Sequence, residues 1–362
     1  MTQTTLTLPQ LFDQLILEGE IEAAQVADKA AILQQLNADP HESDSPWFVK
    51  LMVGFSAWLA ALILGSFFSL AGLINSPESM LLWGAILCPA AIILKRSAMS
   101  SIFLGQLAFA ASLVGQGLLI VGLGSWVENV TLTLLCVIGL ELLLFFLYPD
   151  LLHRLISVLA VCVALLGLLY NWEWMDAVHL FTVAFAVGAL LVWLETERFL
   201  SGRFAPLHAP LGYGLVLALF ALMLLKLANI FELFDLSRWW LSSLGLAAVL
   251  LYLGLWTLNK LDFPLLSLPT VSMIAALVLL SIPIYETPGI LAALIVLNLG
   301  FWCHNRLLLG LATIFLLFFL GTYYYYLDVT LLNKSYILMG SGGVLLLLWA
   351  VFRQLNAREV AL

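Results

Sequence analysis

Long apolar segments recur along this chain, and they constrain its fold more than any other feature of the sequence. Runs of about 18 or more apolar residues follow one another from Trp47 onward, and each is about long enough for a helix to cross roughly 30 Å of hydrocarbon. In lipid, only a helix or a closed barrel satisfies its own backbone hydrogen bonds. Barrel strands would alternate apolar and polar side chains, whereas segments such as AVLLYLGLWTL are apolar all round. We therefore expect an all-α fold, a polytopic integral membrane helical bundle.

The composition agrees with a chain that is covered by membrane lipid. Hydrophobic residues make up 63% of the 362 residues and charged residues only 10%, against about 25% charged residues in soluble domains. After residue 46 the chain holds 13 basic and 14 acidic residues, so it lacks the basic patch of a nucleic-acid-binding protein. We expect lipid, and no nucleic acid, among its partners.

Twelve segments are predicted to cross the membrane. The second and tenth are short, so counts of 10 or 11 stay open. The predicted spans are 47–74, 79–94, 101–124, 130–148, 151–170, 177–194, 208–226, 239–257, 265–283, 288–303, 306–326 and 331–352.

The distribution of basic residues predicts the orientation of these spans, because Lys and Arg accumulate in short cytoplasmic loops. With the N-terminal segment in the cytoplasm, eleven of the 14 Lys and Arg residues fall on that side, and only Lys226, Arg238 and Lys334 lie outside. Dropping one span from the middle would reverse every later loop and remove this bias. We therefore expect both termini to be cytoplasmic.

Two regions divide the chain. Residues 1–46 hold eight acidic residues and one lysine, and they favour two short amphipathic helices followed by a polar linker. We interpret 1–46 as an acidic cytoplasmic helical segment and 47–362 as the multi-pass transmembrane domain. The loops of that domain are mostly shorter than ten residues, which leaves no room for a soluble catalytic domain.

Glu141 is the one acidic residue well inside a predicted span. An ionised carboxylate there is costly, so it is expected to be protonated, paired or next to a wet cavity. Gln106, on the preceding antiparallel span, falls at a similar predicted depth and could form a hydrogen bond with it. Two interpretations follow: a clamp between helices, or an intramembrane proton or ion site.

Other motifs predict packing rather than chemistry. The third span carries GQGLLIVGLGS, and small residues of this kind let helices approach closely in lipid; unwound helices that line a transport site are the alternative. Histidines 153, 208 and 304 fall at predicted cytoplasmic helix ends without the spacing of a metal site. Phosphate-loop and nucleophile-elbow motifs are missing from the sequence. We expect no enzyme, no cofactor and no metal.

The stretch YYYYLDVTLLNKS places polar chemistry at the predicted outer surface. Tyr323 and Tyr326 belong to a run of four tyrosines, which favour the membrane interface. Lys334 lies on the outer side and in the first turn of a helix, and both positions disfavour a cation. Asp328 is the nearest residue that could neutralise it. Two interpretations follow: a structural pair of Asp328 and Lys334, or a periplasmic docking site formed by all four residues.

This stretch, together with SPWFVKLMVGFSAWLAALILGSFF at the first span, resembles the bacterial membrane proteins of the domain of unknown function 4401 family, which are akin to the 2157 family. The resemblance extends over essentially the whole membrane region. It implies a multi-pass protein of the bacterial inner (cytoplasmic) membrane without an assigned activity. It also implies association with a membrane-anchored protein named for its GDYXXLXY motif, and it supplies no catalytic residues.

Two functions follow from these expectations. The first is a structural or assembly subunit that binds a membrane-anchored partner at its periplasmic face. The alternative is a secondary transporter or channel for a small solute or ion, with Glu141 as the intramembrane proton or ion site.

Overall fold

The computed structural model describes the following residues: 47–97, 102–202, 204–230, 238–261, 263–264, 267–281, 285, 287–326 and, from 332 to 350, all but 334, 337, 338, 345 and 348. Every regular element among them is a helix, so the predicted all-α class is confirmed. The predicted segment 1–46, and the positions of Asp328 and Lys334, lie outside the described residues.

Eleven long or medium helices and two short helical turns make up the numbered elements. In chain order they are α4 (Trp47–Leu70), α5 (Pro77–Ser97), α6 (Ile102–Val127), α7 (Val130–Leu147), α8 (Leu151–Asn171), η2 (Met175–Ala177), α9 (Val178–Leu194), α10 (Thr196–Leu200), α11 (Ala205–Ile230), α12 (Trp239–Lys260), α13 (Leu268–Ser281), α14 (Pro288–Trp302) and α15 (Arg306–Tyr326). The described residues between 332 and 350 are helical as well.

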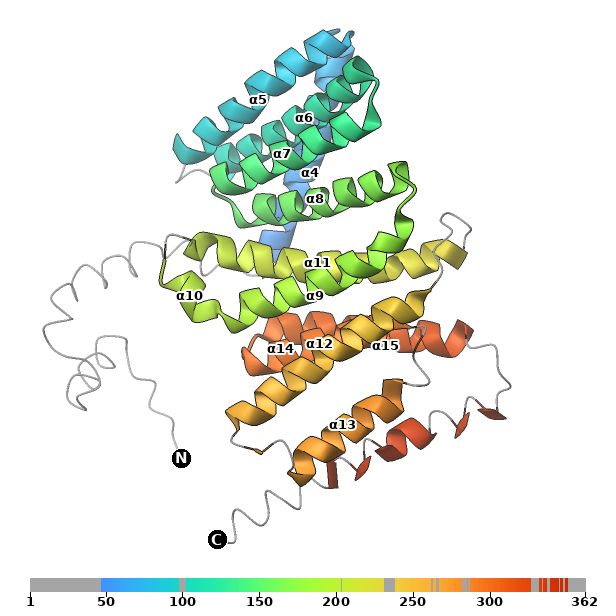
Figure 1. The fold of residues 1–362 in the computed structure, drawn as a ribbon. Helices are drawn as coiled ribbons and strands as arrows, with labels where there is room; N and C mark the ends of the chain where they lie inside the picture. Colours follow the sequence, from blue (N-terminus) through green and yellow to red (C-terminus); the bar gives the residue numbers. More distant parts are fainter. Residues whose placement is uncertain are drawn as a thin grey trace, which may run out of the picture.

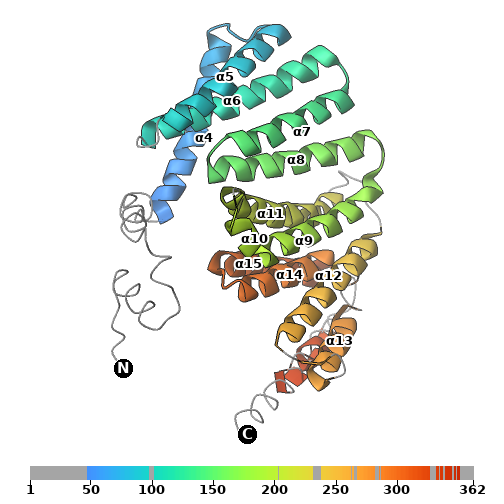
Figure 2. The same cartoon turned by 60° about the vertical axis from the view of Figure 1, so that its left-hand side comes forward.

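Most of these helices stack side by side into an elongated body (Figure 1). One end is formed by α5, α6, α7 and α8, and the other by α12, α13, α14 and α15, with α9 and α11 between them. The helix α4 is inclined steeply to the others and crosses α6, in the first view and in the view turned by 60° (Figure 2). The end formed by α5–α8 therefore has α4 as an additional packing partner.

Eight of the described helices are long and apolar enough to cross a membrane: α5, α6, α7, α8, α9, α11, α12 and α15. Three shorter apolar helical stretches are Leu59–Leu70, Thr270–Leu279 and Pro288–Trp302. Each of the first eleven predicted spans overlaps one helix. However, α13 and α14 have 14 and 15 residues, a rise of only about 21–23 Å. A multi-pass membrane protein is supported, whereas the number twelve and the orientation of the termini stay predictions.

The main apolar core lies among α9, α11, α12, α14 and α15. Phe220 of α11 stacks on Phe315 of α15 with ring centroids 4.1 Å apart, and both Leu219 and Ile295 are fully buried. Lipid tails are as apolar as these side chains, so close packing and dispersion hold the helices together. The end formed by α5–α8 has a smaller apolar cluster around Ala91, Ala111 and Tyr148.

Close approach of α5 and α6 depends on glycine. A Cβ atom at Gly115 would lie 2.8 Å from Cys88 Sγ and 3.1 Å from the Cys88 backbone nitrogen, whereas Gly117 has nothing within 4 Å. This agrees with the predicted role of glycines in packing α6. The same contact brings α5 against the polar residues described next.

Candidate polar site within the membrane bundle

A tight turn sets the geometry of the polar site between α7 and α8. Tyr148 precedes Pro149, which disfavours a helical conformation, and its backbone is extended, with φ −87° and ψ 116°. Asp150 then caps α8 by accepting a hydrogen bond of 3.1 Å from the backbone N–H of His153. The chain therefore reverses within three residues, and polar side chains of the two helices face the same neighbours.

Charged groups close the end of the bundle at this turn. Lys95 Nζ, near the end of α5, lies 2.7 Å from Asp150 Oδ2, and the two side chains are 26% and 24% exposed. Arg154 donates hydrogen bonds of 3.0 Å to the carbonyl oxygens of Phe145 and Pro206. Charge-assisted bonds of this kind are stronger than neutral ones, so they tie α5, α7, α8 and α11 together.

His153 lies one turn further into α8 and is only 1% exposed. Its Nε2 atom lies 2.8 Å from Ser112 Oγ and 2.9 Å from Gln116 Nε2, both on α6. The Tyr148 ring stacks on the imidazole with centroids 4.0 Å apart, and Phe109 packs edge-on. An amide nitrogen donates, so Nε2 accepts and the proton of the neutral imidazole belongs on Nδ1.

Glu141 lies deeper, six residues before the end of α7, which corresponds to about 9 Å along the helix. It is 1% exposed. Its neighbours are the Ser157 hydroxyl of α8 and the Cys88 thiol of α5, which lies within electrostatic reach of the carboxylate. Neither neighbour is a cation, so burial strongly disfavours the ionised carboxylate at this depth.

Unpaired polar atoms concentrate in the α7–α8 hairpin. Seven buried side-chain nitrogen or oxygen atoms lack a hydrogen-bond partner among the described residues, and four of them are Glu141 Oε2, Tyr148 Oη, His153 Nδ1 and Ser157 Oγ. An unpaired buried polar group costs about 1–3 kcal/mol. Such groups in a native protein call for an explanation, and bound water or an ion is the usual one.

The Tyr148 phenol remains protonated in this environment. Burial raises the pKa of this side chain well above its ordinary value, and the negative charge of Asp150 acts in the same direction. The phenol can therefore donate a hydrogen bond but does not release its proton at physiological pH. Its main contribution is the ring face that holds the imidazole of His153.

The two residues predicted to share a clamp do not meet. Gln106 accepts a hydrogen bond of 3.2 Å from Ser56 Oγ on α4, whereas Glu141 lies beside Ser157. Ser112 and Gln116, rather than Gln106, face the α7–α8 hairpin. Six residues separate Gln106 from Ser112, which turns them about a third of a revolution apart on α6. Similar depth in the membrane does not bring two residues together, because contact also depends on this rotation about the helix axis.

The predicted docking residues are only partly described. Tyr323 is 9% exposed and packs into the main apolar core, whereas Tyr324 and Tyr325 are exposed. Nothing is described of the side chain of Tyr326, or of Asp328 and Lys334. Tyr323 therefore lies in the interior of the protein and not on a docking surface.

The contribution of α8 is not among the expectations from the sequence, which place His153 at a helix end and do not include Ser157. The signal was the spacing of Asp150, His153 and Ser157, which are three and four residues apart and so share one face of a helix. We name these three residues the α8 polar stripe.

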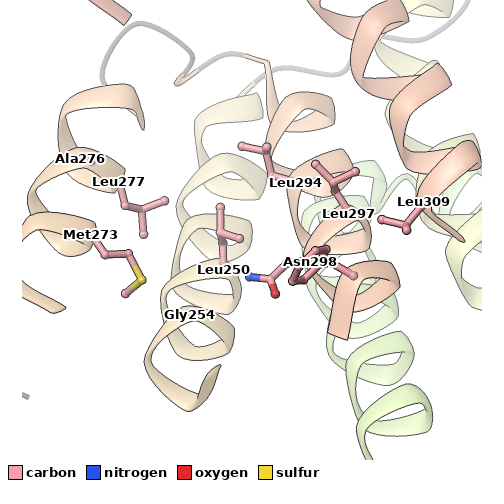
Figure 3. Close-up of a pocket in the computed structure, with 10 residues that line it drawn as sticks. Leu250, Gly254, Met273, Ala276, Leu277, Leu294, Leu297, Asn298 and Leu309 are labelled. Carbon is pink, nitrogen blue, oxygen red and sulfur yellow. The ribbon is translucent and has the colours of Figure 1, made fainter. Parts of the chain in front are cut away.

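An apolar cavity of about 590 Å³ lies at the other end of the molecule, among α12, α13, α14 and α15 (Figure 3). Met273 and Leu277 of α13 point across it toward Leu250 of α12, and Asn298 of α14 is the polar residue of its lining. Its ten lining residues include no titratable group. The cavity therefore suits an apolar chain rather than a charged solute.

Three comparisons with known proteins complete the description. No curated protein gives a significant match to the chain, and no solved structure does so. A family model described as domain of unknown function (DUF4401) matches residues 46–355. This match covers every helix of the bundle, and the chain belongs to the DUF4401 family.

Proposed function

We propose that this protein is a proton-linked membrane protein of the secondary transporter class, in which Glu141 takes up and releases the proton. The observation that carries the proposal is the burial of Glu141 on a membrane-spanning helix, with Oε2 unpaired beside the unpaired Ser157 Oγ. Ionisable residues inside a membrane span are costly, and they mark proton and ion pathways.

The surroundings of Glu141 support a proton rather than a metal cation as its ligand. A metal ion would need several oxygen, nitrogen or sulfur ligands from charged or polar groups. No group of three or more His, Cys, Asp or Glu residues in the described part could hold a metal ion. A proton needs only the carboxylate, and its uptake removes the charge that lipid opposes.

The proposal includes the environment of the protein. The spans cross the inner membrane of a bacterium twelve times, with both termini in the cytoplasm, and no enzymatic reaction takes place. In this orientation the Lys95–Asp150 end of the bundle faces the cytoplasm. The support is the bias of Lys and Arg in the sequence.

A labelling experiment tests the protonation of Glu141. A hydrophobic carbodiimide adds to protonated carboxyl groups in apolar surroundings and leaves a stable adduct that mass spectrometry locates. We expect an adduct on Glu141 in native membranes, and a lower yield as the pH rises. Glu141→Gln removes the adduct. The exposed Glu197 offers the control Glu197→Gln, which leaves it unchanged. An unlabelled Glu141 at every pH would contradict the proposal.

Proton movement is tested with the purified protein in liposomes that contain a pH-sensitive dye. Under an imposed membrane potential we expect proton flux through the wild type, and a loss of about tenfold or more in Glu141→Gln. Vesicles that hold their gradient as well as protein-free vesicles would refute proton transport. Equal flux in the wild type and Glu141→Gln would refute the role of Glu141.

A second candidate function is that of an assembly subunit which binds a membrane-anchored partner at the periplasmic face. The exposure of Tyr324 and Tyr325 at the end of α15 favours it, since exposed aromatic side chains are frequent in protein interfaces. The family resemblance suggests a protein with a GDYXXLXY motif. Purification from native membranes in mild detergent should recover such a protein, and replacement of both tyrosines by serine should release it. Recovery of the chain alone would refute this function.

A further inference from the structure

The α8 polar stripe meets a different helix at each of its three levels. At the end of the bundle, Asp150 pairs with Lys95 of α5. One turn further in, His153 meets Ser112 and Gln116 of α6. One more turn in, Ser157 lies beside Glu141 of α7. Three polar levels thus connect the charged end of the bundle with the buried carboxyl group.

The two inner levels, those of His153 and Ser157, share a second property. His153 Nδ1, Ser157 Oγ and Glu141 Oε2 are buried and unpaired among the described residues, and each side chain is only 1% exposed. A buried site that is polar on several sides suits a water molecule, which needs two to four polar partners. Residues four apart on a helix have Cβ atoms about 5–6 Å apart, a gap that one water molecule bridges.

We propose that the α8 polar stripe is the proton access route between Glu141 and the Lys95–Asp150 end of the bundle. This inference rests on the proposed role of Glu141 as a proton site. It adds the path of access on one side of the membrane: protons pass between Glu141 and the Lys95–Asp150 end along α8, and His153 carries them past the level of the Tyr148 ring.

The proton balance of this route is simple. Neutral His153, which carries its proton on Nδ1, takes a second proton on Nε2 through the Ser112 hydroxyl and becomes an imidazolium cation. It then releases the Nδ1 proton through water at Ser157 to the Glu141 carboxylate, and both side chains end neutral. The imidazole, now protonated on Nε2, returns to its first tautomer before the next transfer. The return path reverses these steps. No bond between heavy atoms forms or breaks, and no other reactant is needed.

Burial of the imidazole has the largest influence on how easily His153 gains a proton, and it opposes the imidazolium form. Among the neighbouring charges, Asp150 favours the imidazolium form, while Arg154 and Lys95 oppose it. Tyr148 stays neutral, as described above, and Cys88 lies at the Glu141 level. The Glu141 carboxylate, when ionised, adds a negative charge that attracts the proton inward.

Another interpretation is that the stripe only joins helices. Hydrogen bonds between membrane helices stabilise a bundle, and His153 would then serve stability alone. The two interpretations differ in one measurable quantity, which is the rate at which the Glu141 carboxyl exchanges its proton with water. Helix joining leaves that rate independent of His153 and Ser157.

The test is infrared spectroscopy of the purified protein after rapid transfer from water to deuterated water. The Glu141 carboxyl band is identified by its loss in Glu141→Gln, and its shift with time gives the exchange rate. We expect His153→Asn and Ser157→Ala each to slow exchange by about tenfold or more. His179→Asn and Ser243→Ala, which change a buried histidine and serine elsewhere, serve as matched controls and leave the rate unchanged.

The outcomes separate the two proposals. A missing carboxyl band in the wild type would refute the proton site at Glu141. A band that is present, but exchanges equally fast in the wild type and Ser157→Ala, would overturn the access route and leave the site intact. Ser157→Ala removes a single hydroxyl beside Glu141 and leaves the hydrogen bonds of His153 to α6 in place, so it tests the route even where His153→Asn fails to fold.

Discussion

Two helices of this protein begin with the same pattern, an aspartate followed three residues later by a histidine. Asp150 and His153 begin α8, and Asp176 and His179 begin the η2–α9 segment. In both cases the aspartate pairs with a base outside its own helix, Lys95 or Arg238. In both cases the histidine contacts a serine of another helix and an aromatic ring. The serines are Ser112 and Ser242, and the rings include Tyr148 and Trp239.

The two helices differ beyond the histidine. In α8 the next polar residue on the same face is Ser157, which lies beside Glu141. In α9 it is Thr182, whose hydroxyl donates to the Val178 carbonyl of its own helix at 2.9 Å, and the main apolar core follows. The same local pattern therefore ends at a carboxyl group in one case and at packed hydrocarbon in the other. What a histidine at a helix start can do depends on the residue that the adjacent helix supplies.

Separating α5 from α6 should destabilise the surroundings of the α8 polar stripe more than any other change considered below. We expect Gly115→Leu to lower the free energy of unfolding by about 3 kcal/mol, because the added atoms would overlap Cys88 and its backbone. At Gly117, on the same helix, an added side chain meets open space. Gly117→Leu should therefore change the free energy of unfolding by less than about 0.5 kcal/mol. Denaturation in mild detergent gives both values. Equal losses would mean that helix propensity, rather than the α5 contact, decides the effect.

A comparison of the two histidines comes next in size. His153→Ala and His179→Ala should each lower the free energy of unfolding by about 2 kcal/mol, because each leaves buried hydroxyl or amide partners unpaired. Only His153→Ala should also change carbodiimide labelling of Glu141. The measurements are thermal unfolding and labelling yield on the same preparations. If His179→Ala altered labelling equally, the two helix starts would not differ in the way we describe.

Much of this fold could be predicted from hydrophobicity alone. The predicted spans match α7 and α8 to within about one residue, because Asn129 and Asp150 cap these helices and Pro149 interrupts the chain between them. Apolar length measures whether a segment can reach across lipid, and capping residues mark where it begins. The steep inclination of α4 has no such signal, since a tilt is set by packing against neighbours.

The candidate site was predicted only in part. Glu141 could be identified because it is the one acid deep in an apolar run, but its partner could not. The sequence gives the height of Gln106 along α6, whereas contact also depends on rotation about the helix axis. His153 looked interfacial because it lies two residues from the start of α8. In the folded protein, Ser112 and Gln116 of α6 lie over that turn and bury His153. This helix packing is a tertiary feature, which helix length and capping do not predict.

The two ion pairs offer a smaller contrast. Asp150 and Lys95 are about one quarter exposed, whereas Asp176 and Arg238 are more than half exposed. We expect Asp150→Asn to lower the free energy of unfolding by about 1 kcal/mol, since asparagine keeps the helix cap and only the pairing is lost. Asp176→Asn should change it by less than about 0.5 kcal/mol. Unfolding at low and at about 0.5 M salt measures both, and salt should abolish the second effect first. A larger effect at Asp176 would contradict the assignment.

Tyr148→Phe tests the smallest difference, at the ring that covers His153. The phenol oxygen is buried and unpaired, so its removal should leave the free energy of unfolding unchanged or raise it by up to about 1 kcal/mol at neutral pH. The folded pKa of Tyr148 is raised by burial, so the unfolded phenol ionises first as the pH rises through about 10. The wild type then loses stability relative to Tyr148→Phe by about 1.4 kcal/mol per pH unit until the folded pKa is reached. Unfolding curves at neutral and alkaline pH measure this difference. A constant difference across pH would mean that the phenol is hydrated in the folded protein, and water at Tyr148 would place the access route along the ring rather than through His153.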